Sequence, residues 1–192
     1  MFESIKNKFQ FRFKDRIYAA NILAAALEDF LSKEKRELKN TSITTVLAIP
    51  RGGVIVADVV ATKLKASNFD IVIPRKLRIP HNEETAFGAI VGDGTVYVDD
   101  RIVRDLDISE DYIEREKYFQ LQEIKRRSEL YRAKNDHVEQ VIENTLNDND
   151  NAAVILIDDG AASGATVIAA ARSIKIRLRE IWSFFITGCF VF

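Results

Sequence analysis

The sequence predicts an α/β fold in which a central parallel sheet is flanked by helices. Two stretches lead to this prediction, residues 43–64 and 154–172, because each runs from an apolar strand through a glycine-containing loop into a helix. A further apolar strand is expected at 70–74, directly after the first helix. Strand–helix–strand spacing of this kind is typical of parallel sheets with right-handed crossovers. In such sheets ligands bind beyond the carboxyl ends of the strands.

The composition is that of a single globular domain spanning residues 1–192. Hydrophobic residues make up 47% and charged residues 30%, and the formal net charge of -1 argues against nucleic acid or an anionic membrane surface as a partner. The single cysteine, Cys189, excludes an intrachain disulfide framework and a cysteine-based zinc site. The N-terminal residues lack the apolar core of a signal peptide, and no apolar run approaches the ~20 residues of a membrane span. We therefore expect a cytoplasmic protein.

The first half of the chain contains the first strand–loop–helix unit. Residues 1–14, with three alternating phenylalanines, predict a short strand or an extended arm. Asp15 is a candidate cap for a helix that runs to about Lys35. Its apolar face is expected at Ala20, Leu23, Leu27, Phe30 and Leu31. A strand over 43–49, a helix over 54–64 and a strand over 70–74 follow.

The second half contains more charged segments. A polar loop is expected over 77–85, and then a hairpin formed by 86–91 and 95–98 around a Gly92-Asp93-Gly94 turn. A long charged helix is predicted to open at Ser109 and to end near Ala133, on the surface or against a partner subunit. A weaker helix is expected over 138–146. The last residues, 181–192, are apolar and β-prone.

The stretch after the predicted strand 154–157 has the features of an anion site. Two acids, Asp158 and Asp159, precede a loop of small residues, and a helix is expected to begin at Thr166. Small residues let backbone N–H groups approach a ligand, and the dipole of a helix favours an anion at its N-terminus. The loop residues are Gly160, Ala161, Ala162, Ser163, Gly164, Ala165 and Thr166. We therefore predict that they bind phosphate, with the acids left to hold hydroxyls or a metal-bound group.

Two common phosphate motifs are absent from this loop. A Walker A loop would need a lysine before its final Ser or Thr, and the sequence has Gly164-Ala165-Thr166 instead. The Gly-x-Gly-x-x-Gly pattern of dinucleotide-binding folds is also missing. An ordinary strand-to-helix turn is the plainer interpretation. Two adjacent acids after a buried strand argue against it, because their desolvation is costly without a use.

Cationic residues follow two other predicted strands. Arg51, Gly52 and Gly53 follow the strand at 43–49, and Arg75, Lys76 and Arg78 follow the strand at 70–74. Because the carboxyl ends of parallel strands meet at one edge, we expect both groups to share a site with the acids. His81 is a candidate general base, although a solvated loop histidine is the plainer interpretation. Phe9, Phe11 and Phe13 are candidates for stacking on a base or, more simply, for packing, and Asp99-Asp100 is read as a turn.

The segment 154–166 resembles the phosphoribosyl pyrophosphate signature of type I phosphoribosyltransferases, which is an apolar strand, two acids and a small-residue loop ending in Thr/Ser-Gly-x-Thr. Further matches to a little-characterised bacterial and archaeal branch of that family span most of residues 12–172. They are Phe13-Lys14-Asp15-Arg16, Ile49-Pro50-Arg51-Gly52-Gly53, Arg75-Lys76-Leu77 and Ala86-Phe87-Gly88-Ala89. The resemblance implies a Rossmann-like parallel sheet. Relatives in this branch continue further after the signature helix, so the C-terminal part looks shortened.

The resemblance also implies roles for single residues. Asp158 and Asp159 would bind the ribose hydroxyls, and Ala161 to Thr166 would bind the 5-phosphate. Arg51, Gly52 and Gly53 would form the pyrophosphate loop, Lys76 would contact pyrophosphate, and Arg75 or Arg78 would assist. Residues 77–84 would correspond to a mobile catalytic loop. Catalysis would be assigned to Asp158, Asp159, Arg51 and Lys76, with Mg²⁺ held through the substrate near the two acids and no direct protein ligand expected.

The function implied is Mg²⁺-dependent transfer of phosphoribose to a nitrogen acceptor, with release of pyrophosphate, by a homodimer. Members that act on 6-oxopurines carry an acid where this chain has Ala162, so the acceptor is left open. The alternative is a non-catalytic regulatory protein that binds phosphoribosyl pyrophosphate. Retained Arg51 and Lys76 favour the enzyme, because a sensor needs no residues that stabilise a leaving group. A receiver-like phosphotransfer domain would not explain the glycine-rich loop.

Overall fold

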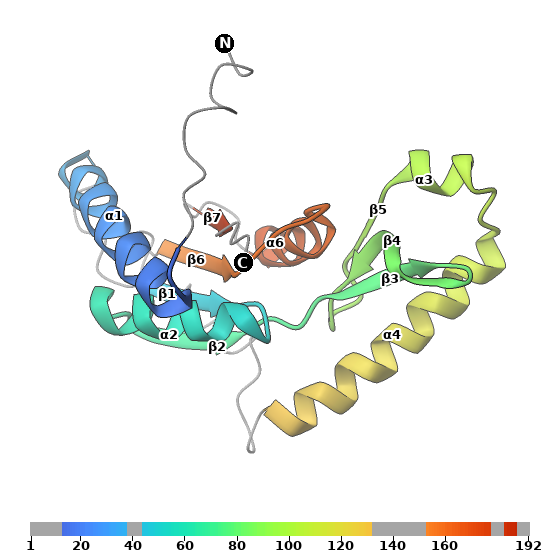
Figure 1. The fold of residues 1–192 in the computed structure, drawn as a ribbon, viewed down its shortest axis with the longest axis horizontal. Helices are drawn as coiled ribbons and strands as arrows, with labels where there is room; N and C mark the ends of the chain where they lie inside the picture. The colour runs from blue at the N-terminus through green and yellow to red at the C-terminus, as the bar shows by residue number, and fades with distance from the viewer. Residues whose placement is uncertain (1–12, 38–43, 132–152, 178–182, 188–192) are drawn as a thin grey trace, which may run out of the picture.

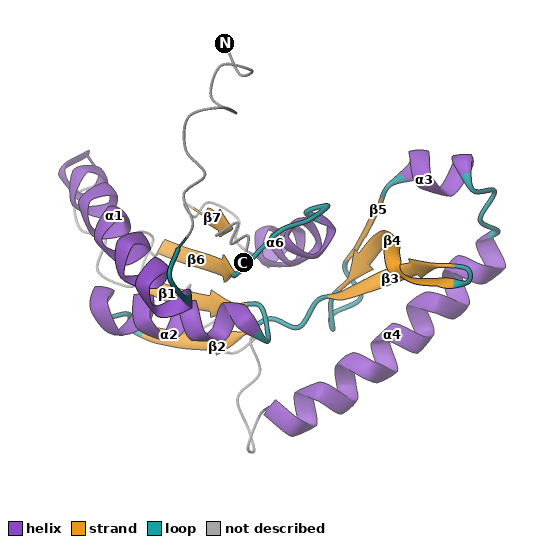
Figure 2. Ribbon diagram, viewed as in Figure 1, coloured by secondary structure: helices purple, strands orange, loops and turns teal. Residues whose placement is uncertain are grey.

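The computed structural model describes residues 13–37, 44–131, 153–177 and 183–187, and these ranges fold around two sheets (Figures 1 and 2). The first sheet contains β1 (Thr44–Ala48), β2 (Asn68–Ile71), β6 (Ala153–Asp158) and β7 (Ser183–Thr187). Its strand order is β2-β1-β6-β7, and all three pairings are parallel. The predicted parallel sheet is therefore confirmed.

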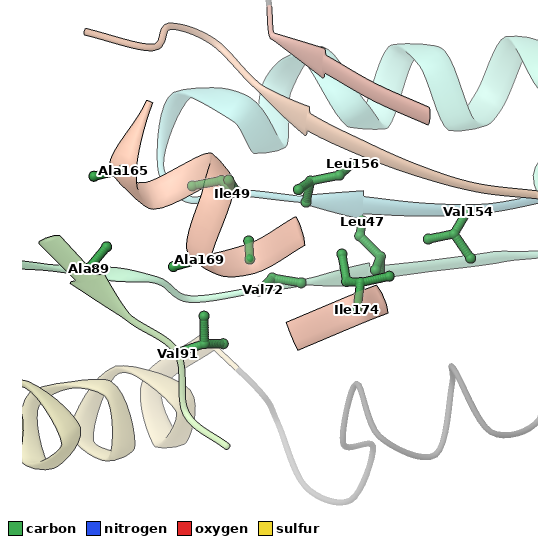
Figure 3. Close-up of a cluster of buried hydrophobic side chains, with 11 residues drawn as sticks. Leu47, Ile49, Val72, Ala89, Val91, Val154, Leu156, Ala165, Ala169 and Ile174 are labelled. Atoms are coloured by element: carbon green, nitrogen blue, oxygen red, sulfur yellow. The ribbon is translucent and has the colours of Figure 1, made fainter. Parts of the chain in front are cut away.

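Helices cover both faces of this sheet because its central strands are apolar on both sides. Val46 and Ala48 of β1 point to the face covered by α1 (Arg16–Glu37) and α2 (Gly52–Leu64). Leu47 and Ile49 alternate with them and point to the opposite face, where they pack with α6 (Ala165–Arg177). Figure 3 shows the cluster on the α6 face. The result is a three-layer arrangement, with α1 and α2 on one face of the sheet and α6 on the other.

The helix α1 begins where the sequence predicts. The Tyr18 backbone N–H donates to Oδ1 of Asp15 at 2.7 Å, so Asp15 caps its first turn. Ala20, Leu27 and Leu31 are buried against α2 and the sheet, and Phe30 is 38% exposed at the edge of that face. The apolar face is thus confirmed, apart from Phe30.

The second sheet is antiparallel, and only one of its two hairpins was predicted. It contains β3 (Arg75–Ile79), β4 (Asn82–Ile90) and β5 (Val96–Val98) in the order β3-β4-β5. The hairpin of β4 and β5 is confirmed. The polar loop expected over 77–85 is wrong, since these residues form a tight β3–β4 hairpin that turns at His81, whose φ is 63°. The reason is burial, because Leu77 and Phe87 lie in one apolar cluster.

Two helices follow the second sheet. The short α3 (Asp100–Asp105) begins after Asp99, which accepts from the Arg101 N–H at 3.1 Å, so Asp99-Asp100 starts a helix and is not simply a turn. The long helix α4 (Glu110–Tyr131) confirms the prediction for 109–133. It runs along the second sheet (Figure 1), with Ile124 buried against Leu77 and Phe87. The predictions for residues 1–12 and 138–146 lie outside the described residues. Of the apolar tail over 181–192, only β7 is described.

Candidate functional site

The candidate site lies where β1 and β6 end side by side. The two strands pair in register from Thr44 with Ala153 to Ala48 with Ile157. Beyond the last pair, the Ile49 N–H still donates to the Ile157 carbonyl at 2.8 Å. Each chain then turns away from the sheet into a loop and a helix. The two loops predicted to share a site therefore begin within one hydrogen bond of each other.

The turn after β1 packs directly against the acid pair. A Cβ placed on Gly52 would lie 1.7 Å from Oδ2 of Asp159, and one placed on Gly53 would lie 2.9 Å from the Ile157 carbonyl oxygen. At Gly53 the close atoms belong to the backbone, so only glycine fits there, and at Gly52 a Cβ would displace the Asp159 carboxylate. The peptide bond between Pro50 and Arg51 is cis, and Arg51 itself is exposed. The structure thus brings the Arg51-Gly52-Gly53 turn and the two acids together, as expected.

The two acids differ in environment. Asp158 is only 7% exposed, and its Oδ1 accepts a hydrogen bond from the Asp159 N–H at 2.8 Å. Burial, followed by the negative charge of Asp159, raises the pKa of Asp158 to about 6, and backbone hydrogen bonds oppose the shift. The Asp159 side chain is 23% exposed. Ionisation of Asp158 is therefore costlier than that of a free aspartate, and Asp159 is the more exposed of the two acids.

Arg16, a residue to which the sequence analysis gave no role, binds the second acid of this pair. Arg16, in the first turn of α1, reaches Oδ2 of Asp159 with both Nε, at 2.8 Å, and Nη2, at 2.7 Å. The two residues are 143 positions apart, so no spacing rule connects them. The only signal in the sequence was that Arg16 closes one of the segments that carry the family resemblance.

The small-residue loop leads into the N-terminus of α6. Gly164 has a φ of 76°, a conformation that glycine adopts without strain, and the helix begins at Ala165, one residue earlier than predicted. The Ala165 N–H points to Oγ of Ser163 at 3.4 Å, and the Ile168 N–H closes the first turn on the Gly164 carbonyl. Gly160, Ala162 and Ser163 are exposed. An exposed loop at a helix N-terminus suits an anion.

The cationic cluster of residues 75–78 is divided between the two faces of β3. Nε of Arg75 donates to Oε1 of Gln120 on α4 at 3.0 Å, and burial is the main cause that lowers the pKa of this guanidinium. The structure therefore places Arg75 against α4 and does not bring it to the acids. Arg78 is also bound to α4 by its backbone, since its N–H donates to Glu116 and its carbonyl accepts from the Tyr112 hydroxyl.

Lys76 lies on the other face of β3. Its partner across the strands is Ala89, and residues directly opposite one another share a face of a sheet. Ala89 packs in the same cluster as Ala165 and Ala169 of α6 (Figure 3). The exposed Lys76 side chain therefore stands on the side of β3 that faces α6 and its N-terminal loop. His81 and Glu84 are exposed at the far hairpin turn, which agrees with a solvated histidine.

Asp158 and Asp159 by themselves offer few ligands for a metal ion. Within the part of the chain that the structure describes, no three His, Cys, Asp or Glu side chains are grouped closely enough to hold a metal ion. Mg²⁺ commonly binds one or two carboxylates and takes its remaining oxygens from phosphates and water. Asp158 and Asp159 fit that mode, in which a bound phosphate ligand supplies the other oxygens.

Comparisons with known proteins agree with this geometry. A model of the phosphoribosyl transferase domain matches residues 14–181. Two Mycobacterium tuberculosis proteins, from strains CDC 1551 and H37Rv, are each 36% identical over 127 residues, and both are named "Putative phosphoribosyl transferase". The match covers 66% of this chain and 26% of theirs, so the chain matches about a quarter of the length of these relatives.

A solved structure shares the fold. The crystal structure of TT1426 from Thermus thermophilus aligns with a TM-score of 0.62 and 27% identity, and the alignment covers 94% of this chain and 86% of that one. Among the described helices, none is both long and apolar enough to cross a membrane.

Proposed function

Since this chain belongs to the phosphoribosyl transferase domain family, we propose that it transfers phosphoribose from phosphoribosyl pyrophosphate to a nitrogen atom of a small acceptor. One observation carries the proposal. The glycine turn after β1 lies against the acid pair after β6, with the position of a Gly52 Cβ 1.7 Å from Asp159. Such a site would give sugar hydroxyls a place between a phosphate loop and a second anion-binding turn, which suits a sugar with phosphate at one end and pyrophosphate at the other.

The acids and the α6 loop would hold the phosphoribosyl half of the donor. Carboxylate oxygens accept hydrogen bonds from hydroxyl groups, so Asp158 and Asp159 suit the ribose 2- and 3-hydroxyls. The exposed loop over 160–164 and the first turn of α6 offer backbone N–H groups to the 5-phosphate. As the anomeric carbon becomes cationic in the transition state, the two negative charges stabilise it.

The cations would bind the departing half. The bond between the anomeric carbon and the pyrophosphate oxygen breaks, and its electron pair leaves with pyrophosphate as the new C–N bond forms. The backbone of the Arg51-Gly52-Gly53 turn and the Lys76 ammonium group offer donors and positive charge to that leaving group. Arg75 is committed to Gln120, so among the three cations of β3 we assign the main contact to Lys76. Mg²⁺, held near Asp158 and Asp159 mainly through the substrate, would supply further charge neutralisation.

Calorimetric titration with phosphoribosyl pyrophosphate and Mg²⁺ tests the donor, and a screen of purines, pyrimidines and other amines for pyrophosphate release tests the transfer. We expect binding that the variant combining Asp158→Asn and Asp159→Asn loses while its circular dichroism spectrum stays native. No binding at millimolar donor would overturn the proposal. Binding without release for any acceptor would favour a regulatory protein that senses the donor. A homodimer in the cytoplasm stays a prediction that light scattering and cell fractionation can examine.

A further inference from the structure

Arg16 forms an ion pair with Asp159 that joins the start of α1 to the end of β6. Its Nε donates a hydrogen bond to Oδ2 at 2.8 Å, and its Nη2 lies 2.7 Å from the same oxygen as an ion pair. A planar guanidinium that meets one carboxylate oxygen through two nitrogens restricts that oxygen more than a single ammonium contact would. The pair is partly exposed, with side-chain exposures of 37% for Arg16 and 23% for Asp159, so a ligand can reach it.

The carboxylate is held from a second side by the turn after β1. Gly52 lies so close that a Cβ there would meet both oxygens of Asp159, at 1.7 Å for Oδ2 and 2.7 Å for Oδ1. The Arg16 hydrogen bond from Nε and the Nη2 ion-pair contact both go to Oδ2. Asp159 thus lies between Arg16 on one side and Gly52 on the other, with Oδ2 as the oxygen that contacts the Arg16 guanidinium.

The first turn of α1 gives Arg16 a rigid base. Asp15 caps the turn through the Tyr18 N–H, and the Ala19 N–H donates to the Asp15 carbonyl at 3.1 Å. Ala20, one turn after Arg16, is fully buried against α2. The Arg16 guanidinium therefore extends from a helix that packs against α2, and α2 begins at Gly52.

We propose that Arg16 is a positioning residue for donor binding, which holds Asp159 with Oδ1 turned toward the hydroxyl groups of the donor sugar. The inference rests on the proposed function. Arg16 acts through Asp159 and not on the reacting atoms, so its loss raises the KM for the donor while kcat is largely retained. A lysine at this position keeps the charge but loses the two-point contact, and it restores only part of the affinity.

The test compares three variants by calorimetric titration with phosphoribosyl pyrophosphate and Mg²⁺. Arg16→Gln is expected to weaken donor binding roughly 10-fold, because a charge-assisted contact is lost from a partly exposed pair. Arg16→Lys is expected to recover a part of that loss. Lys14→Gln is the matched control, since it removes a nearby exposed positive charge without touching Asp159, and its affinity should stay within about 2-fold of wild type. Melting temperatures identify any variant that fails to fold, and Arg16→Lys then decides the question.

A double-mutant cycle separates positioning from a general electric field. In an Asp159→Asn background, Arg16→Gln should cost little further donor affinity, because the carboxylate that it orients is gone. Additive losses would overturn the inference, as would wild-type affinity in Arg16→Gln or an equal loss in Lys14→Gln. If the wild-type protein itself does not bind the donor, the proposed function fails together with the inference. Donor binding that is indifferent to Arg16 overturns the inference alone.

Discussion

The two sheets present their charged residues in different ways. In the parallel sheet the charges lie at the strand ends, where Arg51 follows β1, Asp158 is the last residue of β6 and Asp159 comes next. In the antiparallel sheet the charges lie within β3, where Arg75 turns to α4 and Lys76 stands on the opposite face. A residue at a strand end is brought to the edge of the sheet by the strand that it follows. A residue inside a strand is placed by the register and by whatever covers each face.

The packing of α4 against the antiparallel sheet explains how Arg75 and Lys76 are oriented. Gln120 of α4 is fully buried, and it accepts from Arg75 while its own amide donates to Glu116. Glu116 in turn accepts from the Arg78 N–H, and the Tyr112 hydroxyl donates to the Arg78 carbonyl. This network satisfies polar groups that would be costly to bury unpaired. The network ties one face of β3 to α4, and the opposite face, which carries Lys76, is directed toward the α6 loop.

The largest expected effect comes from filling the contact between the two strand-end loops. Gly52→Ala puts a Cβ into the Asp159 carboxylate, so we expect donor affinity to fall roughly 10- to 100-fold, in line with the 1–3 kcal/mol of overpacking. Gly92→Ala is the control in the antiparallel sheet region, where the nearest contact is Cγ2 of Ile124 at 3.2 Å. Calorimetric titration of both variants measures the difference. Equal affinities would mean that the two loops do not form one donor site.

A smaller effect is expected to distinguish Lys76 from its neighbour Arg75 in β3. Lys76→Gln is expected to weaken donor or pyrophosphate binding about 10-fold, with the melting temperature unchanged, because its side chain is exposed on the α6 side. Arg75→Gln is expected to leave binding nearly unchanged and to lower the free energy of unfolding by about 1 kcal/mol, since it removes the contact to Gln120. Titration and chemical denaturation of each variant measure both quantities. The opposite pattern would return Arg75 to the pyrophosphate site.

The smallest effect concerns stability and pH at the strand-end acids. The pKa of Asp158 is raised to about 6, above the 3.8 of a free aspartate, so the folded state binds more protons than the unfolded state between these values. The unfolding free energy of the wild type therefore declines as pH rises through this window. Asp158→Asn removes that cost, and we expect it to be more stable than wild type at pH 7 by about 1 kcal/mol, with the advantage shrinking toward pH 4.

Urea denaturation at pH 4.5 and pH 7 measures this difference, and Asp58→Asn, at an exposed acid on α2, provides the control. A constant difference between Asp158→Asn and wild type at both pH values would show that burial of this carboxylate does not govern its titration. The same variant should lose donor affinity, so the acid would be retained for binding at the expense of stability.

Several elements could be predicted because their signals are local. The apolar runs at 44–48 and 153–158, each followed by glycines and a helix, specify strand, turn and helix within a few residues. The cap at Asp15 and the charged helix that follows Ser109 are equally local. The hairpin of β3 and β4 was missed because its polar residues resemble a loop. What makes it a hairpin is the burial of Leu77 and Phe87 against α4, which is remote in sequence.

The sequence by itself determined that an acid pair and a small-residue loop follow one buried strand, and that a glycine turn follows another. Neighbouring residues decide such features through backbone conformation and apolar pattern. Only the tertiary structure decided that Arg16 pairs with Asp159, that Gly52 lies against the same carboxylate, and that Arg75, not Lys76, is the cation that faces α4. These contacts depend on strand register and helix packing between segments far apart in the chain, and no local pattern carries that information.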